Sequence, residues 1–163
     1  MRLTAYVALG ANLGDPVAAV QAALAALDRI PDTRMIAASP LYRTAPVGLR
    51  HQPDFINAVA ALEVDSAILP APTFLARLFA IEAAFGRVRA EKNAPRTLDL
   101  DLLLYGDLRV SEPGLTLPHP RMTERAFVLA PLADIAPALD IPGHGPIAGL
   151  LDAVTRQRIE RFT

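Results

Sequence analysis

Residues 95–105 read PRTLDLDLLLY and place two acids one residue apart in an otherwise apolar segment. Side chains alternate between the two faces of a strand, so Asp99 and Asp101 share one face and the neighbouring leucines share the other. The two backbones are then roughly 6.5–7 Å apart, and both carboxylates can approach one point. Because like charges repel, and repel more when partly buried, the pattern predicts a strand with one apolar side and one acidic side that requires a positive partner.

Basic residues precede this strand and suggest what the positive partner is. They are Arg87, Arg89, Lys92 and Arg96. A carboxylate pair that holds Mg²⁺ beside arginines that bind phosphate is a recurrent arrangement in proteins that act on nucleotide phosphates. An edge strand with a solvated acidic face would show the same D-x-D spacing, so the spacing alone leaves both interpretations open.

A second group of hydrogen-bond donors lies in residues 117–125, LPHPRMTER. His119, Arg121 and Arg125 stand near a predicted helix start, where backbone N–H groups also favour anions. Arg121 and Arg125 are four residues apart, so both can face one ligand if the helix has begun. Taken on its own, however, the segment is better interpreted as a surface turn in which Thr123 caps the helix.

The segment 10–14, GANLG, is interpreted as a turn from strand to helix and not as a phosphate loop. A Walker loop has Lys followed by Ser or Thr after its glycines, whereas Asp15 and Pro16 follow here. The glycine spacing also differs from that of a dinucleotide-binding fingerprint. His51 and His144 are isolated in the sequence and indicate no further site.

The composition indicates one domain spanning residues 1–163. Hydrophobic residues make up 52% and charged residues 20%, an ordinary globular balance. The net charge of −1 argues against a general attraction to nucleic acid. The absence of cysteine excludes disulfides and cysteine-bound metal and fits a reducing compartment. Because no apolar run reaches about 18 residues and the first residues lack the pattern of a signal peptide, we expect a cytoplasmic protein without membrane contact.

The hydrophobic pattern predicts an α+β fold. Strands and helices alternate in the order strand, helix, strand, strand, helix, strand over residues 3–9, 16–29, 34–44, 55–64, 70–86 and 98–105. Asp15 is expected to cap the first helix and Gly86 to end the second, while Pro40 interrupts the second strand and suggests an edge or a bulge. This order is the split βαββαβ arrangement of a ferredoxin-like antiparallel sheet with helices packed on it. The C-terminal extension is expected to contain a short strand at 108–110, a helix near 123–132 and an amphipathic helix near 147–162.

Six segments, in this order and spacing, resemble the 6-hydroxymethyl-7,8-dihydropterin pyrophosphokinase family of folate-pathway enzymes. They read YVALGANLGDP, SPLYRTAPVG, QPDFINAV, FGRVR, PRTLDLDLLLYGD and LPHPRMTERAFVLAPL. The resemblance covers most of the chain up to about Pro137. It implies transfer of the β,γ-diphosphoryl group of ATP to the hydroxymethyl oxygen of the pterin, with release of AMP.

The resemblance also implies roles for individual residues on the nucleotide side. Asp99 and Asp101 would hold two Mg²⁺ ions, one bridging the α- and β-phosphates and the other bridging β and γ. Arg87 and Arg96 would be catalytic and flank a loop that closes over the triphosphate. The positions that match the ATP-binding side are Glu82, Arg89, His119, Arg121 and Arg125.

On the pterin side, the resemblance implies that Phe55 and Phe127 sandwich the flat ring, for which offset stacking is the favoured geometry. Asn57 can offer both a donor and an acceptor to the pterin edge. The backbone of Thr44, Ala45, Pro46 and Val47 would complete that pairing. From the residues alone, packing in the core is the favoured interpretation of both phenylalanines.

A binding module with the same sheet is the competing hypothesis, either an RNA-binding or a small-metabolite regulatory domain. Sheet-based RNA readers present aromatic and basic side chains on their central strands. Here the first strand has only Tyr6 and the fourth strand carries acids, so RNA binding is disfavoured. We therefore expect small-molecule substrates, no nucleic-acid partner and a monomer.

Overall fold

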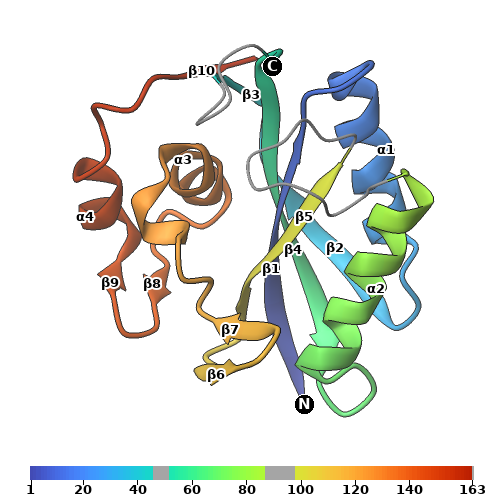
Figure 1. Cartoon of the computed structure of the whole chain (residues 1–163). Coiled ribbons are helices and arrows are strands. Elements are labelled where there is room, and N and C mark those ends of the chain that lie inside the picture. Colours follow the sequence, from blue (N-terminus) through green and yellow to red (C-terminus); the bar gives the residue numbers. More distant parts are fainter. Residues whose placement is uncertain (46–51, 87–97, 163) are drawn as a thin grey trace.

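The computed structural model describes residues 1–45, 52–86 and 98–162. Within these residues the chain forms an antiparallel six-stranded sheet with helices on both faces (Figure 1). Its first part contains β1 (Arg2–Ala11), α1 (Pro16–Asp28), β2 (Thr33–Ala38), β3 (Tyr42–Thr44), β4 (Phe55–Asp65), α2 (Ala71–Ala84) and β5 (Asp99–Tyr105). This order and the antiparallel pairing confirm the predicted α+β, ferredoxin-like arrangement.

The strand order across the sheet is β10-β3-β4-β1-β5, where β10 (Ile159–Arg161) is the last strand of the chain, and β2 pairs with β4 beside β3. The predicted strand 34–44 is therefore two strands, because Ser39 and Pro40 interrupt the ladder. The Ser39 hydroxyl accepts a hydrogen bond from the backbone N–H of Val59 at 2.9 Å. This side chain gives the N–H of β4 a partner where the ladder is interrupted. Proline lacks an N–H and is confined to such breaks and edges.

Helices α1 and α2 cover one face of the sheet (Figure 1). Asp15 caps α1 as predicted, since its carboxylate accepts from the N–H of Ala18 at 3.1 Å, and Pro16 occupies the first turn. Helix α2 ends at Ala84, and Gly86 just beyond it has a φ of 79°, the left-handed conformation that commonly terminates a helix at a glycine.

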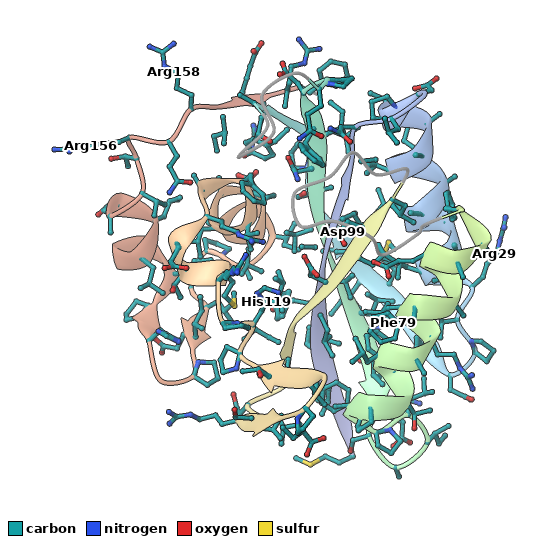
Figure 2. All side chains as sticks on the ribbon, viewed as in Figure 1. Arg29, Phe79, Asp99, His119, Arg156 and Arg158 are labelled. Carbon is teal, nitrogen blue, oxygen red and sulfur yellow. The ribbon has the colours of Figure 1, made fainter. Side chains whose placement is uncertain are left out.

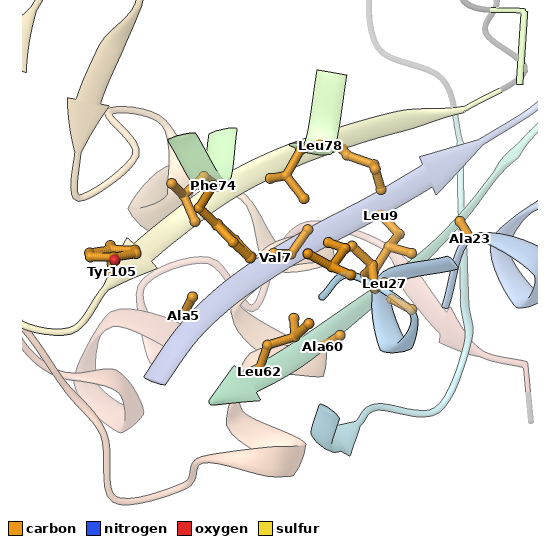
Figure 3. Close-up of a cluster of buried hydrophobic side chains, with 14 of the residues drawn as sticks. Ala5, Val7, Leu9, Ala23, Leu27, Ala60, Leu62, Phe74, Leu78 and Tyr105 are labelled. Carbon is orange, nitrogen blue, oxygen red and sulfur yellow. The ribbon is translucent and has the colours of Figure 1, made fainter. Parts of the chain in front are cut away.

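The core under these two helices is apolar and fully enclosed. Figure 3 shows Val7 and Leu9 of β1 between Leu27 of α1 and the α2 side chains Phe74 and Leu78. Phe74 is completely buried, and its ring centroid lies 6.3 Å from that of Tyr105 at the end of β5. The leucines that alternate with the two acids belong to the same cluster. They are Leu98, just before β5, and Leu100 and Leu102 within it.

The opposite face of the sheet is covered by the C-terminal part of the chain (Figure 1). Its elements are β6 (Val110–Glu112), β7 (Leu115–Leu117), the 3₁₀ helix η1 (Met122–Glu124), α3 (Ala126–Ile135), β8 (Asp140–Ile141), β9 (Gly145–Pro146), α4 (Ile147–Asp152) and β10 (Ile159–Arg161). A second apolar cluster contains Val59 of β4, Leu103 of β5 and Leu129 and Leu132 of α3.

Three predictions for this extension were imprecise or wrong. The expected strand 108–110 begins at Val110 and belongs to the β6–β7 hairpin. The expected helix 123–132 is the 3₁₀ turn η1 followed by α3, with Arg125 in extended conformation between them. The expected helix 147–162 is wrong, because α4 stops at Asp152 and β10 pairs with β3. That pairing partner lies about a hundred residues away in the sequence, so local periodicity could not indicate it.

Among the described residues, no helix combines the length and apolar character needed to cross a membrane.

Phe74→Ala should lower the free energy of unfolding by about 3–5 kcal/mol, because it removes a fully buried ring and leaves a cavity in the core. Phe79→Ala is a matched control on the same helix, where the ring is 42% exposed, and should cost much less. Urea denaturation of both variants measures the difference. Equal losses would contradict the core assignment.

Candidate active site

A cavity of about 610 Å³ lies between the sheet and the start of α3. Strands β1, β3, β4 and β5 form one wall, and η1, α3 and the segment that leads into β10 form the other. Its lining includes the predicted site residues Thr44, Ala45, Phe55, Asn57, Asp99, Asp101, Arg121, Arg125 and Phe127. The fold thus brings together residues from distant parts of the chain that the sequence analysis had assigned to one site.

Small residues of β1 make room for the cavity on the sheet. Gly10 lies between Asn57 of β4 and Asp99 of β5 in the strand register, and Ala8 lies next to Asp101. A Cβ atom added to Gly10 would stand 3.1 Å from the side-chain nitrogen of Asn57, closer than most such contacts. Neither residue carries a polar or reactive side chain by which a sequence pattern could identify it as part of a site. Because their side chains are small or absent, Ala8 and Gly10 leave room for the cavity on the α3 side of β1.

Asp99 and Asp101 point to the α3 side of β5, as the alternation of the strand predicted. Both line the cavity, while Leu100 between them is buried in the core beneath α2. Figure 2 shows Asp99 near His119 on this side of the sheet. Each carboxylate is half-buried, so the acidic face is a cavity wall and not a solvated edge.

Glu82 of α2 supports the same strand from its other side. The side chain is 2% exposed, and its Oε2 accepts a hydrogen bond from the backbone N–H of Leu100 at 2.7 Å. A buried carboxylate that accepts a backbone N–H holds that peptide group firmly in place. Glu82 does not line the cavity, so its assignment to ATP stays a prediction. Its observed contact fixes the peptide between the two aspartates.

His119 lies next to the acidic pair without lining the cavity. Its Nδ1 accepts from the backbone N–H of Arg121 at 3.2 Å, and its Nε2 lies 3.9 Å from Oδ1 of Asp101. Burial is the main cause that lowers the pKa of His119 from 6.5 to about 4, with Arg125 and Arg121 adding to it and Asp99 opposing. The imidazole is therefore neutral near pH 7, with its proton on the nitrogen that faces Asp101.

Arg125 and Phe127 enter the cavity from the start of α3. The Arg125 guanidinium lies over the Phe127 ring, 5.4 Å from its centroid. A cation over an aromatic face is attracted by the ring quadrupole, so this contact restrains the guanidinium beside the cavity. Arg121 joins them from the turn before η1. This wall therefore combines two guanidinium groups with one aromatic surface.

Phe55, Thr44 and Asn57 form the sheet side of the same space. Thr44 and Phe55 are paired across β3 and β4. The Thr44 hydroxyl donates to Oδ1 of Asn57 at 2.8 Å, and both side chains are buried, which fixes the orientation of the Asn57 amide. An amide oxygen has two acceptor sites, so Asn57 retains one for a ligand.

The turn after β1 confirms the interpretation of segment 10–14. Asn12 is buried and its side-chain nitrogen donates to Gln52 at 2.7 Å and to the carbonyl of Pro53 at 3.0 Å. Gly14 has a φ of 63°, as a tight turn requires. The Asn12 amide is used to anchor the start of β4 and not to cradle a phosphate.

Several predicted residues lie outside the described residues, and others in the site were missed. The former are Arg87, Arg89, Arg96, Pro46 and Val47. The latter include Glu124, Gln157, Arg158 and Ile159, which also line the cavity. The last three had been assigned to the helix 147–162, so no pattern in the sequence directed attention to them.

The acidic pair fits a site for Mg²⁺ that is completed by substrate. Within the described part of the chain, no group of three or more His, Asp or Glu side chains is arranged to hold a metal ion. Mg²⁺ binds in many phosphate sites through only one or two carboxylates, with phosphate oxygens and water as the other ligands. Two half-buried carboxylates on a cavity wall suit that incomplete set.

In protein free of divalent cations, His119 should remain neutral well below pH 6 and titrate near pH 4. Because its pKa is lower folded than unfolded, the unfolded chain binds an additional proton as the pH falls from about 6.5 towards 4, and stability decreases over that range. His119→Gln should reduce this decrease in urea denaturation between pH 7 and 4.5. Histidine NMR titration with a midpoint near 6.5 would contradict the assignment.

Comparison with known proteins agrees with this arrangement. Residues 6–137 match the family model of 7,8-dihydro-6-hydroxymethylpterin-pyrophosphokinase (HPPK). A curated protein named 2-amino-4-hydroxy-6-hydroxymethyldihydropteridine pyrophosphokinase from Pseudomonas aeruginosa is 49% identical over 157 residues, which cover 96% of this chain and 95% of that protein. A protein of the same name from Haemophilus influenzae is 42% identical over 149 residues, which cover 91% of each.

The fold is also found among solved structures. A crystal structure of Plasmodium falciparum HPPK-DHPS superposes with a TM-score of 0.72 at 14% identity. The match covers 96% of this chain and 46% of that one, and at this identity it concerns the fold alone. The family match includes β3, β4, β5, η1 and α3, which form most of the cavity, and ends before the segment that leads into β10. The chain belongs to the 7,8-dihydro-6-hydroxymethylpterin-pyrophosphokinase (HPPK) family.

Proposed function

We propose that this protein transfers the diphosphoryl group of ATP to the hydroxymethyl oxygen of 6-hydroxymethyl-7,8-dihydropterin and releases AMP, a step of folate biosynthesis. One observation carries the proposal: the acidic pair of β5 and the aromatic residues Phe55 and Phe127 line one cavity. A polyphosphate and a flat heterocycle can therefore bind side by side. Membership of the HPPK family supports the same reaction.

Asp99 and Asp101 are proposed to hold two Mg²⁺ ions. When bound, the ions would neutralise the charge of the triphosphate and make the β-phosphorus more electrophilic. Both carboxylates face the cavity from one strand, and the Leu100 peptide between them is fixed by Glu82. Diphosphoryl transfer depends more on in-line placement of the reacting groups than on a strong base. A fixed pair of metal ligands supports that placement.

The arginines near α3 are proposed to bind the phosphates. Arg121 and Arg125 line the cavity opposite the acidic strand, and a guanidinium binds phosphate through a planar fork of donors. The neutral His119 can donate from Nε2 towards the acidic pair or an oxygen bound there. Arg87, Arg89 and Arg96 are proposed to contribute further positive charge from the segment before β5, with Arg87 and Arg96 in the catalytic role.

The pterin is proposed to bind between Phe55 and Phe127. These rings reach the cavity from the sheet and from α3, so a flat ring between them would stack on both. Asn57 and the backbone of residues 44–47 would pair with the polar edge of the pterin. The Thr44 hydroxyl supports this role because it holds the Asn57 amide in one orientation.

We further propose that residues 1–163 act as one domain and as a monomer. The described lining of the cavity combines the sheet with the C-terminal elements that cover one of its faces, which supports a single domain. Because ATP is the proposed donor, the cytoplasm is the proposed compartment.

Incubation with ATP, Mg²⁺ and 6-hydroxymethyl-7,8-dihydropterin should yield AMP and the pterin diphosphate in equal amounts. Chromatographic separation of AMP, ADP and ATP measures this directly, and removal of Mg²⁺ with EDTA should stop the reaction. Formation of ADP, or turnover that is unaffected by EDTA, would contradict the proposed reaction. A regulatory binding module would give no nucleotide product.

Asp99→Asn and Asp101→Asn should each reduce turnover by about 10²-fold or more, because each removes a proposed metal ligand while keeping the side-chain shape. Asp107→Ala is a matched control, since this carboxylate is exposed just beyond β5. Circular dichroism and steady-state AMP formation should be recorded for all three. Near-normal turnover in either asparagine variant would refute the metal assignment.

A further inference from the structure

The side-chain amide of Gln157 bridges the two peptide groups that flank Arg125. Its Oε1 accepts from the backbone N–H of Ala126 at 2.9 Å, and its Nε2 donates to the backbone carbonyl of Glu124 at 2.6 Å. The two bonds connect residues 31 and 33 positions apart in the sequence. One amide therefore fixes the chain on both sides of a cavity arginine.

These bonds act at a point where the backbone changes conformation. Arg125 is extended, with φ −122° and ψ 110°, between the end of η1 and the start of α3. Within the described residues, Arg125 itself provides no side-chain cap for α3. The first N–H groups of a helix lack partners inside the helix and are usually capped by a neighbouring side chain. For the N–H of Ala126, that partner is Gln157, which lies 31 residues further along the chain.

The contact continues into the sheet wall of the cavity. Two residues after Gln157, β10 begins and pairs with β3, with Ile159 opposite Thr44. Arg161 of β10 forms an ion pair with Asp134 of α3 at 3.0 Å. The segment from Gln157 to Arg161 therefore connects the α3 wall, with Arg125 and Phe127, to the β3 wall.

We infer that Gln157 is a positioning residue that aims Arg125 and Phe127 into the cavity. This inference rests on the proposed function, because its effect on activity is exerted through the proposed phosphate and pterin contacts of those two side chains. Loss of the amide would release the peptide groups around Arg125, so the guanidinium and the ring would occupy their bound positions for less of the time. Substrate affinity should then fall more than the stability of the fold.

Gln157→Ala should reduce kcat/KM for ATP by about tenfold, mainly through KM, because two hydrogen bonds that orient Arg125 are lost. Gln157→Glu keeps an acceptor for Ala126 but cannot donate to Glu124 and should give an intermediate loss. Arg156→Ala is the matched control, since Arg156 is exposed, does not line the cavity and projects away from the molecule (Figure 2). Thermal unfolding should change little in all three variants.

Two further measurements separate positioning from direct contact with substrate, which matters because Gln157 also lines the cavity. Hydrogen exchange of the Ala126 amide should accelerate in Gln157→Ala and not in Arg156→Ala. In an Arg125→Ala background with saturating pterin, adding Gln157→Ala should change kcat/KM for ATP by less than about twofold, since the effect on ATP is exerted through Arg125 and Phe127 acts on the pterin.

Faster Ala126 exchange together with this non-additivity would support the inference. Unchanged Ala126 exchange, or losses that multiply in the double variant, would overturn it. Wild-type protein that forms no AMP would instead overturn the proposed function, while Ala126 exchange would still decide whether Gln157 holds the start of α3.

Discussion

The structure depends on the alternation of side chains along β5. One side of this strand is anchored by leucines in the core beneath α2, and the other presents Asp99 and Asp101 to the cavity. Moving the register by one residue would exchange these two sides and bury the acids under the helices. The apolar side therefore specifies the position of the charged side, and core packing and the site cannot be varied independently. Glu82 reinforces this by holding the Leu100 peptide from α2.

Much of the first half of the fold could be predicted because its signals are local. Helical spacing, the Asp15 cap and the terminal Gly86 gave α1 and α2, and the alternation around Asp99 gave the orientation of β5. The break at Ser39 and Pro40 was indicated only in part, since its compensation by Val59 involves a different strand. The C-terminal part was harder, because β10 exists only through pairing with β3.

The same distinction applies to the candidate site. Residues with recognisable chemistry, such as Arg125, Phe127 and Asn57, could be proposed from the sequence and are brought to one cavity. Residues that contribute by being small, or by holding the backbone of a neighbouring segment, could not be proposed from the sequence. Ala8 and Gly10 matter because they are small, and Gln157 because it reaches two peptide groups far away in the sequence. Such roles depend on three-dimensional neighbours, for which a single sequence carries no direct signal.

The position of β10 at the rim of the cavity affects how the protein can be handled. The two ends of the chain lie at opposite ends of the sheet, and the C-terminal end is beside β3 (Figure 1). The Arg43 guanidinium lies over the ring of Phe162, 4.8 Å from its centroid, and the N–H of Phe162 donates to the carbonyl of Leu41, so the last described residue is held against β3. A purification tag or fluorescent protein joined at the C-terminal end would follow directly on the strand that contributes Ile159 to the cavity lining, whereas one joined before Met1 would extend from the opposite end of the sheet.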